Sequence, residues 1–86
     1  MTPFVTIILP AFNAVNTIEE CLDSLVAQVE VDFEILVIDD GSTDSTGEIA
    51  KRFSRAYEFV YYLYKPNGGI VTALNFGISK ARGNYI

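Results

Sequence analysis

The sequence predicts an α/β fold built on an open parallel sheet, with helices that alternate with the strands. Short, apolar and β-prone segments at Phe4–Leu9, Ile35–Ile38 and Phe59–Tyr64 are typical of strands. Segments with the periodicity of amphipathic helices separate these strands. A strand–helix–strand order calls for parallel pairing through right-handed crossovers, with helices on the faces of the sheet.

Composition excludes several classes of protein. The 86 residues suffice for one small domain, and half of them are hydrophobic, which excludes a disordered chain. The net charge of −5 and the scattered positions of the 6 basic residues argue against nucleic-acid binding. One cysteine and no histidine exclude a disulfide framework and a Cys/His zinc site. No segment has the ~20 apolar residues of a membrane span, so we expect a cytoplasmic protein.

The first strand and helix follow from the pattern of residues 4–26. Pro10 is expected to end the strand because proline has no N–H to donate to a neighbouring strand. The apolar stripe of the helix consists of Ile18, Cys21, Leu22, Leu25 and Val26. Because Cys21 lies on this stripe and the chain has no histidine to activate it, we interpret it as a structural thiol rather than a nucleophile.

Two adjacent carboxylates, Asp39 and Asp40, directly follow an unbroken apolar run. The run Ile35–Ile38 is typical of a strand that is buried on both faces. Open α/β sheets place ligand crevices at the carboxyl ends of such strands. Two neighbouring acids repel one another there, which predicts a donor-rich partner. The alternative is that both acids only cap the next helix or close the turn at Gly41.

The rest of the chain predicts two further helices and two further strands. Ser45 and Glu48 form a capping box at the start of the second helix. Phe59–Tyr64 is interpreted as a strand near the sheet edge, whose tyrosines either pack within the fold or offer a stacking platform. Asn84–Ile86 predicts the beginning of a fourth strand. The third helix is predicted from an apolar stripe of Val71, Leu74, Ile78 and Ala81.

Three strand ends, at residues 10–13, 39–42 and 65–69, should therefore lie along one edge of the sheet. Such a crevice suits a nucleotide, because carboxylates accept from base N–H groups or ribose hydroxyls and glycine loops leave room for a ligand. The chain has neither the Gly-x-Gly-x-x-Gly motif of dinucleotide folds nor the Gly-x-x-x-x-Gly-Lys-Ser/Thr motif of P-loops. The sequence thus predicts a nucleotide site of a different kind.

At these strand ends the sequence resembles family 2 glycosyltransferases, whose GT-A fold has a Rossmann-like open parallel sheet. The matching segments cover essentially the whole chain in the order expected of the family. They are Val5-Thr-Ile-Ile-Leu-Pro-Ala-Phe-Asn13, Ile18-Glu-Glu-Cys-Leu-Asp-Ser-Leu25, Phe33-Glu-Ile-Leu-Val-Ile-Asp-Asp-Gly-Ser-Thr-Asp44, Asn67-Gly-Gly-Ile70, Ala73-Leu-Asn-Phe-Gly-Ile78 and Gly83-Asn-Tyr-Ile86.

The resemblance implies that residues 1–86 bind the nucleotide of a sugar-nucleotide donor, usually a UDP-sugar. It assigns this role to Pro10, Ala11, Phe12, Asn13, Asp39, Asp40, Asn67, Gly68 and Gly69. Asp39 would accept a hydrogen bond from the base, from a uracil N–H, while Asp40 would lie nearby on the nucleotide or structure the turn. Residues 67–69 would border the base and the diphosphate. Leu74 departs from the arginine of many members, so a phosphate contact from that position is lost.

The resemblance also implies parts of the enzyme that follow this stretch. An Asp-x-Asp motif would hold Mg²⁺ or Mn²⁺ on the donor diphosphate, where the metal acts as a Lewis acid. A general base would deprotonate the acceptor hydroxyl. Residues 1–86 end before both, so we expect them to be the N-terminal part of the GT-A domain and to be inactive alone.

The parent reaction would be transfer of a sugar, expected to be a hexose, in cell-wall or polysaccharide biosynthesis, and the full-length parent can be membrane-associated. The alternative is a non-catalytic fragment that binds nucleotide or self-associates through the sheet edge left by the strand at Asn84. The residues do not indicate the donor sugar, the acceptor, the linkage or the oligomeric state.

Overall fold

The computed structural model describes residues 5–27, 33–81 and 84–85. The described residues form a four-stranded sheet in the order β3-β2-β1-β4, and every pairing in it is parallel, as the sequence predicts. The chain alternates strands with helices: β1 (Val5–Ala11), α1 (Ile18–Val26), β2 (Phe33–Asp40), α2 (Thr46–Ala56), β3 (Val60–Lys65), α3 (Ile70–Lys80) and β4 (Asn84–Tyr85). Gly83 and Ile86, which belong to the predicted C-terminal segment, lie outside the described residues.

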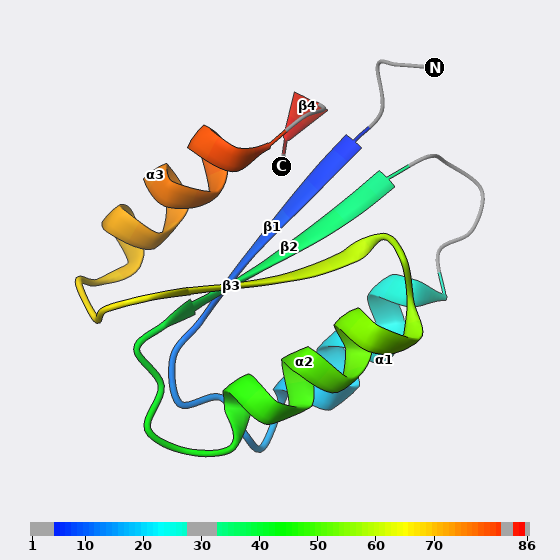
Figure 1. Ribbon diagram of the computed structural model, residues 1–86, viewed down its shortest axis with the longest axis horizontal. Helices are drawn as coiled ribbons and strands as arrows, with labels where there is room; N and C mark the ends of the chain where they lie inside the picture. Colours follow the sequence, from blue (N-terminus) through cyan, green and yellow to red (C-terminus); the bar gives the residue numbers. More distant parts are fainter. Residues whose placement is uncertain (1–4, 28–32, 82–83, 86) are drawn as a thin grey trace.

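The sheet separates two layers of helices. Figure 1 shows α1 and α2 side by side on one face and α3 alone on the other. The central strand β2 is buried on both faces, which confirms the prediction from its apolar run. Successive side chains of a strand point to opposite faces. Accordingly, Ile35 and Val37 belong to the core beneath α1 and α2, whereas Leu36 and Ile38 belong to the core beneath α3.

Strand β1 continues through Pro10, where the sequence predicted its end. Pro10 pairs with Ile38 and Ala11 pairs with Asp39, so the strand runs to the edge of the site. On its other side β1 pairs with β4 only at Val5 and Thr6 in the described part of the chain. In the described part of the chain, no strand pairs with this side of β1 at Pro10. The sheet therefore tolerates a proline, which has no N–H to donate.

Helix α3 turns a different face to the sheet from the one its apolar stripe predicted. Val71, Leu74 and Ile78 are 67%, 37% and 39% exposed, whereas Ala73 and Gly77 are buried. The predicted stripe is therefore wrong at these three residues, whereas its fourth member, Ala81, packs against the core beneath α3. The small residues are buried because they let the helix approach the sheet closely. A Cβ placed on Gly77 would lie 2.6 Å from the Ile8 Cγ2.

The remaining elements follow the prediction more closely. Strand β3 lies at the sheet edge, as expected. Helix α2 begins after Ser45, but no Ser45 side-chain hydrogen bond caps it; instead Asp44 Oδ1 accepts from the Thr46 N–H at 2.9 Å. Cys21 is partly buried on α1. None of the helices in the described ranges has the length and hydropathy needed to cross a bilayer.

Candidate functional site

The carboxyl ends of β1 and β2 meet the start of α3 around a small cavity. The parallel register sets Ala11 level with Asp39 and sets Asp40 level with Lys65, so the strand ends coincide. This convergence confirms the geometry expected from the strand order. The cavity has a volume of about 110 Å³ and is lined by Pro10, Ala11, Phe12, Asp40, Ile70 and Ala73.

The two adjacent acids face opposite sides of the sheet. Asp39 continues the face of Val37, beneath α2, and is only 2% exposed. Its Oδ2 accepts from the Tyr62 hydroxyl at 2.6 Å, and its Oδ1 accepts from the Ser42 N–H at 2.9 Å. Gly47 closes over this contact, because a Cβ there would lie 2.8 Å from Asp39 Oδ2. Asp39 is not among the residues that line the cavity.

Tyr62 supplies the donor that Asp39 needs. Burial and the hydrogen bond to Asp39 raise the pKa of the Tyr62 hydroxyl, which keeps it protonated across the physiological range. The sequence suggested strand packing or a stacking platform for the tyrosines of this strand. The structure adds a hydrogen-bonding role for Tyr62, which sequence reasoning missed.

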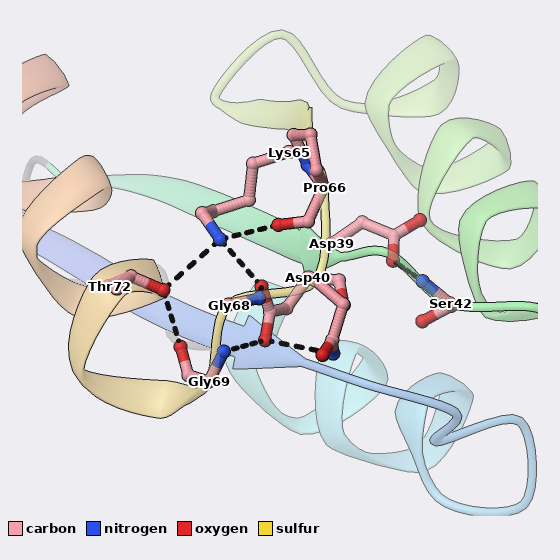
Figure 2. A network of polar contacts seen from close by, with 9 residues as sticks. Asp39, Asp40, Ser42, Lys65, Pro66, Gly68, Gly69 and Thr72 are labelled. Carbon is pink, nitrogen blue, oxygen red and sulfur yellow. Dashed lines mark hydrogen bonds and ion pairs between the residues drawn. The ribbon is translucent and has the colours of Figure 1, made fainter.

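Asp40 faces α3 and the cavity. Its Oδ1 accepts from Lys65 Nζ at 2.7 Å and from the Gly68 N–H at 3.0 Å. Its Oδ2 accepts from the Gly69 N–H at 2.9 Å (Figure 2). At a longer 3.4 Å, Oδ2 also accepts from Asn67 Nδ2. The Lys65 hydrogen bond, supported by the two glycine N–H groups, holds the pKa of Asp40 below its ordinary value. Asp40 is therefore an ionised acceptor.

The protein itself thus provides the donors that two neighbouring acids require. Asp39 closes the turn to Ser42, as the turn-forming alternative predicted, whereas Asp40 holds the loop before α3 instead. One hydrogen-bond acceptor position of the Asp40 carboxylate nevertheless has only a long, weak contact. Oδ1 has two short hydrogen bonds, whereas Oδ2 has one short bond and one long one. A ligand N–H can replace the long contact.

Lys65 ties the end of β3 to α3. Its Nζ donates to Asp40 Oδ1, to the Pro66 carbonyl oxygen at 2.6 Å and to Thr72 Oγ1 at 3.1 Å (Figure 2). Thr72 Oγ1 in turn donates to the Gly69 carbonyl oxygen at 2.9 Å. Sequence reasoning missed Lys65. The signal is its register opposite Asp40, which becomes visible only once the two strands are aligned.

The loop after β1 is fastened to the loop after β2. Asn13 donates from its N–H to Ser42 Oγ at 2.9 Å, and its Oδ1 accepts from the Thr43 N–H at 2.8 Å. The Ala14 N–H donates to Thr46 Oγ1 at 2.8 Å. Asn13 has a positive φ of 49°, a conformation that asparagine tolerates better than most residues. Its side chain therefore holds the loop.

The predicted site residues divide accordingly. Pro10, Ala11, Phe12 and Asp40 line the cavity, and Phe12 is 51% exposed. Residues 67–69 lie beside it through their contacts with Asp40. Asn13 and Asp39 contribute to the surrounding loops rather than to the cavity lining.

The described side chains do not fit a divalent metal centre. In residues 5–27, 33–81 and 84–85, no three Asp, Glu, His or Cys side chains lie close enough together to hold an ion. The carboxylate at the cavity, Asp40, is already paired with Lys65.

Comparisons with known proteins agree with this architecture. The profile of the family described as Glycosyl transferase family 2 matches residues 6–86. An uncharacterized glycosyltransferase of Bacillus subtilis, EpsJ, is 43% identical over 86 residues, which are 100% of this chain and 25% of EpsJ. This chain therefore spans about a quarter of the length of that relative.

Solved structures of two enzymes share the fold. Glucosyl-3-phosphoglycerate synthase from Mycobacterium tuberculosis, in complex with Mn²⁺, UDP and glucosyl-3-phosphoglycerate, has a TM-score of 0.79 at 26% identity, covering 98% of this chain and 33% of that one. The mannosyltransferase PcManGT from Pyrobaculum calidifontis, in complex with GDP-Man and Mn²⁺, has a TM-score of 0.78 at 28% identity, covering 95% of this chain and 25% of that one. Divalent metals thus accompany the nucleotide in both relatives. Given the family match over residues 6–86 and the parallel sheet shared with these enzymes, this chain belongs to glycosyltransferase family 2 and has the GT-A architecture.

Proposed function

We propose that this chain binds the nucleotide of a sugar-nucleotide donor, a UDP-sugar, for transfer of the sugar to an acceptor hydroxyl. The observation that carries the proposal is the cavity at the strand ends, where apolar walls surround the carboxylate of Asp40. The UDP complex of glucosyl-3-phosphoglycerate synthase, which covers 98% of this chain, supports the choice of nucleotide. The GDP-Man complex of PcManGT makes guanine the competing base.

The cavity suits a nucleobase. Its volume of about 110 Å³ is below the ~300–1,000 Å³ of pockets that enclose a whole small ligand, so it can hold one part of a nucleotide. Pro10, Ala11 and Ala73 offer apolar walls, and the exposed ring of Phe12 offers a face for stacking. The Oδ2 atom of Asp40 offers an acceptor for a base N–H.

This arrangement moves the base-accepting role from Asp39, where the sequence placed it, to Asp40. Asp39 supports the site from the opposite face, through Tyr62 and Ser42. The diphosphate would lie towards the exposed residues 67–69, where the N-terminal end of α3 favours negative charge. The cavity at the strand ends favours nucleotide binding over self-association, the alternative for this chain.

Amide NMR of ¹⁵N-labelled protein titrated with UDP tests the proposal. We expect the amides of Phe12, Asp40 and Gly69 to shift at millimolar UDP. Asp40→Asn should weaken binding about tenfold or more, because it removes the charge from a hydrogen bond to an ionised group. The matched variant Asp23→Asn makes the same chemical change on the exposed side of α1 and should bind within about twofold of the wild type.

Two outcomes would contradict the proposal or its assignment. If the amides of a folded wild-type protein do not move at millimolar UDP, the nucleotide site is absent. If UDP binds but Asp39→Asn weakens it more than Asp40→Asn does, at equal folded fraction, the base contact belongs to Asp39. A well-dispersed spectrum of each variant establishes that it is folded.

A further inference from the structure

We propose that Lys65 determines which bases the site accepts, by holding Asp40 as a fixed hydrogen-bond acceptor. The inference rests on the proposed function and adds a specificity-determining residue to it. Lys65 itself need not touch the nucleotide. It acts through Asp40, and it restricts the ligand to bases that carry an imino N–H.

The contacts of Lys65 fix its geometry. Its side chain is only 14% exposed, and Nζ has three oxygen acceptors, on Asp40, Pro66 and Thr72. An ammonium group has three hydrogens, so these acceptors use all of them. Lys65 is therefore a structural donor rather than a free cation awaiting a phosphate.

These contacts also fix the state of the Asp40 carboxylate. Oδ1 is held by Lys65 and Gly68, which leaves Oδ2 as the oxygen that can accept from a ligand. Asp40 is 4% exposed, and a carboxylate this buried stays ionised only when donors or cations compensate its charge. Lys65 provides the cation, and it is the main cause of the lowered pKa of Asp40.

An ionised carboxylate distinguishes bases by the proton on their ring nitrogen. Uracil carries an N–H at N3, and guanine carries one at N1, so either base can donate to Oδ2. Cytosine has an unprotonated N3, which is an acceptor and repels the carboxylate. A site that needs a donor rejects a ligand lacking it, because the buried acceptor is left without a partner.

Removal of Lys65 should make the site discriminate less between uracil and cytosine. Loss of the ammonium removes the largest cause of the lowered pKa of Asp40 and its contact with Oδ1. A carboxyl that takes up a proton can donate to N3 of cytosine. The change therefore alters the ratio of uridine to cytidine affinity, which a general loosening of the loop would not alter. This ratio separates the specificity role from a purely structural one.

The test compares UDP and CDP binding by amide NMR or calorimetry at neutral pH. We expect the wild type to prefer UDP over CDP by about ten- to a hundredfold, the range for one hydrogen bond to a charged group. Lys65→Met should lower this preference about tenfold. Lys65→Arg, which keeps a cationic donor, should restore most of it. Lys80→Met is the matched control, because Lys80 lies at the far end of α3, and it should keep the wild-type preference.

Each unfavourable result has a separate meaning. If folded wild-type protein binds neither nucleotide, the proposed function fails and this inference fails with it. If the wild type binds UDP and CDP equally, the nucleotide site stands but the acceptor role of Asp40 is overturned. If the wild type discriminates and Lys65→Met discriminates equally well, the role of Lys65 alone is overturned. Should Lys65→Met not fold, Lys65→Gln provides the same comparison with a neutral donor.

Discussion

The Tyr62 hydroxyl is the residue-scale feature with the most direct energetic consequence. It donates at 2.6 Å to Asp39, whose side chain has little access to water because the residue is 2% exposed. Tyr62→Phe leaves Asp39 Oδ2 without this donor, and an unsatisfied buried acceptor costs about 1–3 kcal/mol. We therefore expect the free energy of unfolding, measured by urea denaturation, to fall by that amount.

Tyr64→Phe is the matched control for this prediction. Tyr64 lies on the same strand and is 58% exposed, so loss of its hydroxyl should change the free energy of unfolding by less than about 0.5 kcal/mol. Equal effects of the two substitutions would show that the Tyr62–Asp39 hydrogen bond contributes no more than an exposed hydroxyl does.

At the same scale, sequence reasoning located Asp39 and Asp40 but gave the base contact to Asp39, whereas Asp40 is the acid that lines the cavity. The strand was expected to end at Ile38, which would leave both acids in one loop. In the structure β2 continues through Asp40, so the alternation of a strand sends neighbouring side chains to opposite faces. The partners Tyr62 and Lys65 could not be assigned, because they depend on the register between β2 and β3.

At the scale of elements, the packing of α3 depends on Gly77. The helix is apolar on both sides, and it buries the side that carries Ala73 and Gly77. Gly77→Ala should gain up to ~1 kcal/mol in helix propensity, but its Cβ would lie 2.6 Å from Cγ2 of Ile8, a stiff β-branched side chain. Overpacking typically costs 1–3 kcal/mol, so we expect a net loss of about 1 kcal/mol in urea denaturation.

Asn75→Ala separates propensity from packing on the same helix. Asn75 is exposed, and its replacement by the best helix former should stabilise the protein by a few tenths of a kcal/mol. The two alanine substitutions are thus expected to have opposite signs. A stabilising Gly77→Ala would mean that α3 does not approach Ile8 as closely as the structure shows.

The elements themselves were well predicted, because alternating apolar strands and amphipathic helices leave a strong signal. The buried face of α3 was not predicted correctly. Periodicity identifies apolar residues, whereas burial on α3 depends on the small size of the side chains. Val71 and Leu74 are more hydrophobic than Gly77, yet the close approach of helix and sheet selects the glycine. The extension of β1 through Pro10 depends on the partner strands, which the local sequence does not reveal.

At the scale of the whole molecule, carboxylates join the strand ends to one another. Asp40 links β2 with the end of β3 and the start of α3. Asp44 links the loop after β1 with the start of α2, through the Val15 and Thr46 N–H groups. Convergence of the strand ends follows from parallel topology and was predicted. The carboxylate links between them are contacts across the sheet, and no local pattern encodes them.

These links make stability depend on pH in a defined direction. The hydrogen bond from Lys65 lowers the pKa of Asp40, and that from Thr46 lowers the pKa of Asp44. A carboxyl whose pKa is lower in the folded state stabilises the fold above its ordinary value of about 3.9, and this contribution is lost as the pH falls through the lowered pKa. We therefore expect the free energy of unfolding to decline as the pH falls below about 4.

The variants Asp40→Asn and Asp23→Asn assign this decline to particular groups. Urea denaturation at pH 7 should show Asp40→Asn less stable than the wild type, because the amide lacks the charge that Lys65 and the two glycine N–H groups compensate. The difference should shrink as the pH falls through the lowered pKa of Asp40, where the wild-type carboxyl is itself becoming neutral. Asp23 is exposed on α1, so Asp23→Asn should differ from the wild type by the same small amount at both pH values. If the difference in unfolding free energy between Asp40→Asn and the wild type stayed the same at acidic pH, the Asp40 link would stabilise the molecule through its packing and not through its charge.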